Sequence, residues 1–340
     1  MSLTRPRPRP IVVSHGPRKK VDFEPLPNVG NLSPDLQPNT PPVFQRPTSQ
    51  NVLKIGKYLL FDHPEGSEVY SAVNSITGEN CVCKVFEVRR YREVLSAYWQ
   101  VDNHEHINSL SEIILGQTKA YVFFEKNYGD LHSYVRQKKR LKEEEAARLF
   151  RQILSAVEHC HANGIILRDL KLRKFVFKDS ARTHLRLDGL EDAVVLDEET
   201  NDLMTDKHGC PAYVSPEILG ATGGAYSGKA ADVWSLGVML YTMLVGRYPF
   251  HDSQPLALFG KIKRGQFSVP DSVAPKAKCL LRSLLRREPS ERLCANQISQ
   301  HPWFKGHWSS GVSGRASPRV SSDQTVPDVP YFNETDSFYL

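Results

Sequence analysis

The hydrophobic pattern of the chain changes from strand-like to helix-like part-way along, and this change limits the folds that it can adopt. Short runs rich in β-branched and aromatic residues, separated by glycine, come first and are typical of strands joined by turns. These runs are Tyr58–Phe61, Glu68–Val73, Asn80–Phe86 and Ala120–Phe124. The first part of the folded region is therefore expected to be a small, strand-rich body.

The second part carries helical patterns. Residues 141–161 place apolar side chains at the three- and four-residue spacing of an amphipathic helix. Residues 232–245 are apolar on nearly all sides, as in a helix buried inside a large body. A strand-rich part followed by a helical part predicts an α+β protein with a small β-rich N-lobe and a larger helical C-lobe. The apolar run at 233–245 is too short to span a bilayer about 30 Å thick, so no membrane partner is expected.

The two ends of the chain differ in composition from the middle. Residues 1–50 are rich in proline and poor in periodic apolar residues, which predicts a disordered arm. Residues 1–20 carry six basic and no acidic side chains, which equals the whole net charge of +6. The arm could serve nuclear import or contact an anionic surface, although a solvated charged arm is the simpler interpretation. We expect a folded region at 51–305, a flexible tail at 306–340, and no direct nucleic-acid binding, because the rest of the chain is neutral.

The cysteines do not form a recognisable framework. They are scattered through the chain, and the pair Cys81 and Cys83 has the wrong spacing for a zinc knuckle. We therefore expect free thiols in a reducing compartment. The six residues are Cys81, Cys83, Cys160, Cys210, Cys279 and Cys294.

Five short motifs occur in one order along the chain. Each is weak alone, but together and at plausible spacing they are highly specific. They are Val82-Cys83-Lys84, Leu167-Arg168-Asp169-Leu170-Lys171, Gly209–Glu217, Asp232–Gly237 and Pro289-x-x-Arg292. From about Tyr58 to Phe304 the chain resembles the eukaryotic protein kinases, which implies their two-lobed fold.

Three departures narrow this resemblance. The catalytic loop has Lys174 where kinases have asparagine, and Gly189-Leu190-Glu191 stands where they have the DFG motif. The tail contains Asp323-Gln324-Thr325-Val326-Pro327-Asp328. In these features the chain resembles the Tribbles family of pseudokinases, which implies a protein of the nucleus and cytoplasm.

The resemblance assigns roles in the chemistry of phosphoryl transfer. Kinases grip the phosphates with a strand lysine, hold magnesium with an aspartate and an asparagine, and orient the substrate with a second aspartate. Lys84 matches the lysine and Asp169 is a vestigial catalytic aspartate, but an ammonium at Lys174 cannot bind Mg²⁺. Gly189 replaces the second metal ligand, although a shift of one residue would bring in Asp188. Loss of both ligands would leave the phosphate charge unneutralised, so we expect no enzyme activity.

Nucleotide binding is left open by the sequence. Between residues 61 and 69 the glycine-rich loop keeps only Gly66, and Pro64 removes a backbone donor. Lys84 could be structural or could contact a nucleotide, and the charge of Lys174 could replace that of a metal. We therefore expect ATP binding to be weak or absent, with no Mg²⁺ and no required cofactor. The alternative is a weak, metal-independent atypical Ser/Thr kinase that uses Lys84 and Asp169.

Other residues match positions that hold the kinase fold together. The resemblance implies that Asp232 caps the catalytic loop and that Arg292 pairs with Glu217. These roles are structural rather than catalytic.

The tail and the end of the folded region suggest partners. In the family, a motif like residues 323–328 recruits a ubiquitin E3 ligase, and a proline in it limits the entropy lost on docking. The residues that match it are Asp323, Gln324, Val326, Pro327 and Asp328. The family also ascribes binding of MAP kinase kinases to the region of His301, Pro302, Trp303 and Phe304, although packing is the safer interpretation of these apolar side chains.

The resulting hypothesis is a pseudokinase adaptor. The resemblance implies that it docks substrates such as CCAAT/enhancer-binding transcription factors and recruits the ligase for their degradation. It also implies that the chain regulates the MAPK cascade as a scaffold or kinase inhibitor.

Overall fold

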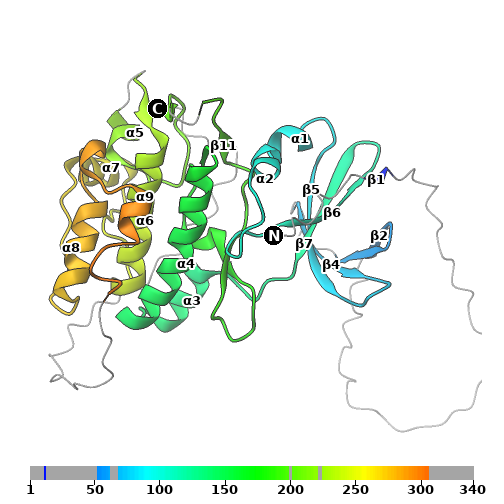
Figure 1. Cartoon of the computed structure of the whole chain (residues 1–340), viewed down its shortest axis with the longest axis horizontal. Coiled ribbons are helices and arrows are strands. Elements are labelled where there is room, and N and C mark those ends of the chain that lie inside the picture. Colours follow the sequence, from blue (N-terminus) through cyan, green and yellow to red (C-terminus); the bar gives the residue numbers. More distant parts are fainter. Residues whose placement is uncertain (1–10, 13–51, 62–67, 199–200, 221–223, 306–340) are drawn as a thin grey trace, which may run out of the picture. The chain divides into compact units, whose positions relative to one another are not determined.

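The computed structural model describes residues 11–12, 52–61, 68–198, 201–220 and 224–305 (Figure 1). The chain divides into two compact units. The smaller unit comprises residues 8–89 and 111–124, and the larger one contains residues 90–110 and 125–340. The smaller unit is built on a sheet and the larger one is mainly helical, so the predicted α+β, two-lobed architecture is confirmed.

The smaller unit holds one seven-stranded sheet in the order β1-β6-β7-β5-β4-β3-β2. Strands β2 to β5 pair as antiparallel neighbours, as expected for strands joined by tight turns. The core of the unit includes Tyr58, whose ring stacks on Phe123 with centroids 3.7 Å apart. The strands are β1 (Ile11–Val12), β2 (Val52–Ile55), β3 (Tyr58–Phe61), β4 (Val69–Asn74), β5 (Asn80–Glu87), β6 (Leu110–Leu115) and β7 (Lys119–Glu125).

Strand β1 differs from the expectation of a disordered arm at two residues. Ile11 pairs with Ile114 and Val12 with Leu115, in parallel to β6 at the edge of the sheet. A sheet edge presents unpaired backbone donors and acceptors, which an extended segment can satisfy. The remainder of the arm, and the whole predicted tail, lie outside the described residues.

Two long helices form the centre of the larger unit. Helix α4 (Glu143–Ala162) begins with three glutamates, which favour a helix N-terminus, and buries the apolar stripe that the sequence shows. Helix α6 (Gly228–Val245) begins at Ser227, whose hydroxyl accepts a hydrogen bond from the Ala230 amide, and ends at Gly246 in the left-handed conformation. Helix α6 is buried on nearly every side and packs against α4 and α8 (Pro275–Leu284) (Figure 1).

The other elements of the larger unit are short. The helices are α1 (Tyr91–Val94), α2 (Ser96–Gln100), α3 (Leu131–Lys138), α5 (Pro216–Gly220), α7 (Pro255–Arg264) and α9 (Ala295–Ile298), with 3₁₀ turns at Leu172–Lys174 and Pro289–Glu291. Three two-stranded ladders pair β8 (Ile165–Ile166) with β11 (Val194–Val195), β9 (Phe175–Phe177) with β10 (Leu185–Leu187), and β12 (Leu203–Met204) with β13 (Tyr226–Ser227). Among the helices of the described residues, none has the length and apolar character needed to cross a bilayer. All six cysteines are free thiols.

Candidate functional site

The catalytic-loop segment is held from within α6. The carboxylate of Asp232, 1% exposed, accepts hydrogen bonds from the amides of Leu167 and Arg168 at 2.9 and 3.0 Å. Its Oδ2 also lies 2.9 Å from Nε2 of His161, on α4. Asp232 thus occupies the capping position that the sequence predicts, and the buried carboxylate has hydrogen-bond partners for both oxygens.

A second buried charge fastens α5 to the rest of the larger unit. The guanidinium of Arg292 donates to both carboxylate oxygens of Glu217, at 2.6 and 2.7 Å. It also donates to the carbonyls of Ala230 and Arg286, both at 2.8 Å. A bidentate pair with these extra bonds fixes geometry as well as charge, in keeping with a structural role.

The side chain of Lys174 lies among carboxylates. Its Nζ is 2.7 Å from Oδ2 of Asp192 and 3.9 Å from Oδ2 of Asp169. Asp169 is also paired with Lys171, at 2.6 Å. The carboxylates at this point of the catalytic loop are therefore neutralised by side-chain ammonium groups.

The charges shift the pKa values of this pair in opposite directions. Burial lowers the pKa of Lys174, but the carboxylates of Asp192, Glu191 and Asp169 outweigh burial and raise it overall. The pKa of Asp192 is held well below its ordinary value, and the largest cause is the contact with His208. Nε2 of His208 lies 3.6 Å from Oδ1 of Asp192. The ammonium of Lys174 lowers the pKa of Asp192 further. Both partners therefore stay charged at neutral pH.

The position of the second metal ligand is occupied by Gly189. Its φ of +96° is a conformation that favours glycine, and a Cβ atom there would lie 2.8 Å from Oε2 of Glu191 and 3.1 Å from Nζ of Lys174. The alternative ligand, Asp188, accepts a hydrogen bond from Nδ2 of the buried Asn108 at 3.3 Å. Within the described residues, no group of three or more His, Cys, Asp or Glu side chains could hold a metal ion. The ammonium of Lys174 lies beside the carboxylates of Asp169 and Asp192. Its positive charge would repel a magnesium ion, so these residues do not fit Mg²⁺.

The segment after Gly189 is tied to α2. The Leu190 side chain is fully buried, and its amide donates to the hydroxyl of Tyr98 at 3.1 Å. The same hydroxyl donates to Oε1 of Glu191 at 3.3 Å. Burial raises the pKa of Tyr98 well above its ordinary value, so this hydroxyl stays protonated and can serve as donor and acceptor together.

Arg168 links the catalytic loop to the segment that follows. Its Nε donates to the carbonyl of Asp192 at 2.7 Å, and its Nη1 lies 2.5 Å from Oδ2 of Asp206. The backbone of Arg168 has a φ of +58°. In this conformation its amide donates to Asp232 while its side chain reaches Asp192 and Asp206.

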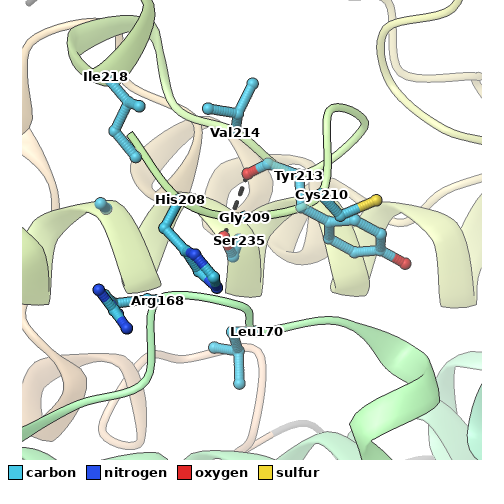
Figure 2. Close-up of a pocket in the computed structure, with 10 residues that line it drawn as sticks. Arg168, Leu170, His208, Gly209, Cys210, Tyr213, Val214, Ile218 and Ser235 are labelled. Carbon is cyan, nitrogen blue, oxygen red and sulfur yellow. Dashed lines mark hydrogen bonds between the residues drawn. The ribbon is translucent and has the colours of Figure 1, made fainter. Parts of the chain in front are cut away.

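A small cavity lies beside Arg168, under residues 208–214 (Figure 2). Its volume is about 10 Å³, which is room for about one water molecule and not for a nucleotide. Over the cavity, Oγ of Ser235 donates to the carbonyl of Tyr213 at 3.1 Å. The lining residues are Arg168, Leu170, His208, Gly209, Cys210, Tyr213, Val214, Ile218, Ala231 and Ser235.

Comparison with known proteins identifies the family. The protein kinase domain model matches residues 65–304. The chain is 58% identical over 313 residues to Tribbles homolog 2 of Canis lupus familiaris, an alignment that covers 92% of this chain and 88% of the relative. The chain belongs to the Tribbles family. It is also 57% identical to human Tribbles homolog 1 over 84% of this chain and 76% of that one, and 48% identical to mouse Tribbles homolog 3 over 94% and 89%. The resemblance predicted from the motifs is confirmed, and with it membership of a pseudokinase family within the protein-kinase superfamily.

Lys84, the predicted phosphate-gripping lysine of this Tribbles chain, belongs to the smaller unit. It lies on β5, and its Nζ is 4.8 Å from the centre of the Phe124 ring, a cation–π distance. Residues 62–67, with Gly66 and Pro64 of the predicted degenerate loop, lie outside the described residues. The possible role of Lys84 in nucleotide binding stays a prediction.

The segment 301–304 packs into the larger unit. Trp303 is 1% and Phe304 6% exposed, and Nε1 of Trp303 donates to Oε2 of Glu143 at 3.1 Å. The carbonyl of Phe304 accepts from Nη2 of Arg151 at 2.9 Å. These contacts support the packing interpretation. The predicted ligase motif at 323–328 lies outside the described residues.

Sequence reasoning did not identify four residues of the site. Tyr98, Asp192 and Asp206 contact Glu191, Lys174 and Arg168, respectively, and the sequence analysis did not foresee these contacts. His208 contacts Asp192 in turn. One signal was available: Asp192 follows the altered metal motif directly, and an acid there is a natural partner for a new lysine at position 174.

Proposed function

We propose that this chain is a pseudokinase adaptor that does not transfer phosphate. The observation that carries the proposal is the position of Lys174, 2.7 Å from Asp192 and 3.9 Å from Asp169. In a kinase this region needs a divalent cation to neutralise the developing phosphate charge. The ammonium of Lys174 is already paired with carboxylates and cannot coordinate the phosphate oxygens of a nucleotide as a metal ion does. This arrangement favours a protein that binds partners over one that transfers phosphate.

The adaptor would have two working parts. The larger unit docks a substrate protein such as a CCAAT/enhancer-binding transcription factor, and the tail motif at 323–328 recruits a ubiquitin E3 ligase. Holding both on one chain turns their meeting into an intramolecular event. The 58% identity to Tribbles homolog 2 supports this assignment. The adaptor would work in the nucleus and cytoplasm.

Regulation of the MAPK cascade would be a second role, through binding of MAP kinase kinases and as an inhibitor or scaffold. Because Trp303 and Phe304 are buried, such a partner would reach only His301 and Pro302 of this segment unless the fold opened. Pro302 is exposed, so we expect a MAP kinase kinase that binds this segment to make its main contact there.

The tail assignment is tested by Val326→Ala combined with Pro327→Ala in the full chain. Pull-down of the ligase should be abolished while the melting temperature stays unchanged, because the motif is removed and the folded region is not altered. Pro318→Ala with Val320→Ala changes the same two residue types outside the motif and should leave the pull-down intact. Undiminished pull-down by the first variant would refute the assignment.

The loss of metal-dependent chemistry is tested by thermal shift with ATP. We expect any rise in melting temperature to be the same with Mg²⁺ and with EDTA, because the residues that the structure describes contain no group of three or more His, Cys, Asp or Glu side chains that could hold a metal ion. A rise that requires Mg²⁺ would contradict the interpretation of Lys174 and Gly189.

The weak atypical kinase is the competing proposal. It has less support because Oδ2 of Asp169 is already paired with Lys171 at 2.6 Å and because Lys174 stands where a kinase has a metal ligand. Its test is ATP-dependent phosphate incorporation by the purified chain that is lost in Asp169→Asn. Incorporation that persists in that variant would indicate a contaminating kinase.

A further inference from the structure

The ion pair between Arg168 and Asp206 joins the catalytic loop to the segment at residues 202–213, here called the activation segment. In active kinases this segment is ordered when an arginine pairs with a phosphorylated threonine or tyrosine. Here the arginine is present, and the anion is a carboxylate of the chain itself, 2.5 Å from Nη1. The Arg168 side chain is 19% and the Asp206 side chain 44% exposed, so water weakens the pair without removing it.

Asp206 is also fixed through its backbone and through the residues before it. Its carbonyl accepts a hydrogen bond from the hydroxyl of Tyr226 at 2.7 Å. Strand β12, which ends two residues before Asp206, pairs with β13. Earlier still, Oδ2 of Asp202 accepts from Oγ of Ser227 at 2.6 Å and from the amide of Lys229 at 3.1 Å. The start of the activation segment is thereby fastened to the N-terminus of α6.

The residues after Asp206 are held at two places, by Asp192 and by helix α6. His208 reaches Asp192, whose carbonyl is held by the same Arg168. The carbonyl of Tyr213 accepts from Oγ of Ser235 on α6. Each of these anchors is a side chain or backbone group of the chain itself.

We infer that Asp206 takes the place of an activation-segment phosphate. It is a positioning residue: its fixed negative charge pairs with Arg168 and keeps residues 202–213 in one conformation without any phosphorylation. A carboxylate carries one negative charge, whereas phosphoserine or phosphothreonine carries nearly two, so its pair with an arginine is weaker. The hydrogen bonds at Asp202, Tyr226 and Ser235 add to the stabilisation of the segment. If the activation segment forms part of the docking surface, that surface is permanently formed; this consequence rests on the proposed function, whereas the ordering does not.

The test is trypsin cleavage after Lys207, an exposed residue next to Asp206. The full chain is produced without phosphorylation, as verified by intact mass, and cleavage at this bond is followed by mass spectrometry. Arg168→Gln, which leaves the cleaved sequence unchanged, and Asp206→Asn should each accelerate cleavage about 3- to 5-fold, as expected for loss of one partly exposed charged pair. Asp206→Glu should restore protection, and rates for position 206 variants are divided by those of the matching unfolded peptides.

The matched control is Arg186→Gln, which breaks another 2.5 Å pair, with Glu125, whose side chains are 14% and 48% exposed. It should leave cleavage after Lys207 within about twofold, as for an unrelated surface pair. The double variant Arg168→Gln with Asp206→Asn should be cleaved no faster than the faster single variant, because the Arg168–Asp206 pair is already lost in each single variant. If a variant melts several degrees lower, hydrogen exchange of residues 203–213 relative to α8 replaces proteolysis as the readout.

Three results would overturn the inference. These are unchanged cleavage in both single variants, additive effects in the double variant, or rapid cleavage of the natural chain that slows only after phosphorylation by an added kinase. No substrate or ligase takes part in the experiment. Its failure is therefore distinguishable from failure of the adaptor proposal, which the ligase pull-down tests.

Discussion

Among single residues, Gly189 shows how the lost metal site has been rebuilt. Its backbone needs a positive φ, and the space that a side chain would fill holds the end groups of Glu191 and Lys174. We predict that Gly189→Ala destabilises the chain by about 2–3 kcal/mol, of which about 1–2 is backbone strain and the rest is displacement of Glu191 and Lys174. Gly129 has the same φ of +96° with open space around its Cβ position, so Gly129→Ala should show the backbone cost alone.

Urea denaturation of the two glycine variants separates these contributions. The difference in free energy of unfolding between them measures the crowding at Gly189. Equal losses in both would mean that Lys174 and Glu191 move aside freely, and that the Lys174 pair is not a fixed part of the site.

Asp192 should make stability depend on pH. Its pKa in the folded chain is well below its ordinary value, so below about pH 5 the unfolded chain binds more protons there than the folded one. The stabilisation is fully present above about pH 5 and is lost as the pH falls. Since the Asp192 side chain is 37% exposed and screened by water, Asp192→Asn should cost about 1 kcal/mol at pH 7, and less by pH 3.

The measurement is urea denaturation of the natural chain and the variant from pH 7 to pH 3. Asp271→Asn breaks a pair with Lys278 in which Asp271 is fully exposed, and should leave stability nearly unchanged across this range. A cost of Asp192→Asn that stays constant from pH 7 to pH 3 would exclude the ionised carboxylate as its source.

The sequence allowed the altered positions of the site to be predicted, but not their new partners. Lys174 and Gly189 stand out because a motif fixes their place in the chain. Asp192, Asp206 and His208 do not, because an ion pair between separate loops leaves no periodic trace. Such partners depend on how the loops turn, for example at Arg168 with its φ of +58°.

At the level of elements, the prediction succeeded where a pattern repeats over several turns. The stripe at 141–161 became α4 (Glu143–Ala162), and the apolar stretch at 232–245 lies within α6 (Gly228–Val245). Helices α1 and α2 show no hydrophobic period in the sequence. Each is only four or five residues long, which is too short to show a period, and contacts such as that of Tyr98 with Leu190 hold them.

Strand β1 was missed, because two residues in a proline-rich arm carry no strand signal. We predict that deleting residues 1–20 makes the amides of β6 exchange about 5- to 10-fold faster, which corresponds to loss of about one backbone hydrogen bond. The measurement is hydrogen exchange of a peptide that spans Leu110–Leu115. Val12→Pro removes a single backbone donor and should produce part of the effect.

The peptide spanning β3 (Tyr58–Phe61) is the internal control, because β3 lies near the opposite edge of the sheet from β1. Its exchange should not change on deletion of the arm. Unchanged exchange in β6 as well would mean that the pairing of Ile11 and Val12 with β6 adds no protection.

For the whole molecule, the adaptor proposal depends on covalent linkage between the folded region and the tail. The proposed ligase motif begins at Asp323, 18 residues after Lys305, where the described residues end. A linker of this length gives effective concentrations on the order of millimolar if both sites engage at once. Ubiquitin transfer to a docked substrate should therefore depend much more on the linkage than on either binding site alone.

We predict that residues 1–305 and a separate peptide of residues 306–340, each at micromolar concentration, support ubiquitin transfer at least about 100-fold more slowly than the intact chain. Insertion of 20 Gly/Ser residues after Lys305 should slow transfer only about threefold, because effective concentration falls roughly as the −3/2 power of linker length. The readout is ubiquitinated substrate against time, with substrate binding to residues 1–305 measured separately as the control for folding. If the separate peptide worked as well as the tethered tail, the tail would act by activating the ligase and not by bringing it to the substrate. The modest effect of a longer linker then distinguishes a flexible tether from a tail that must dock at a fixed place, since a fixed geometry would lose nearly all activity on insertion.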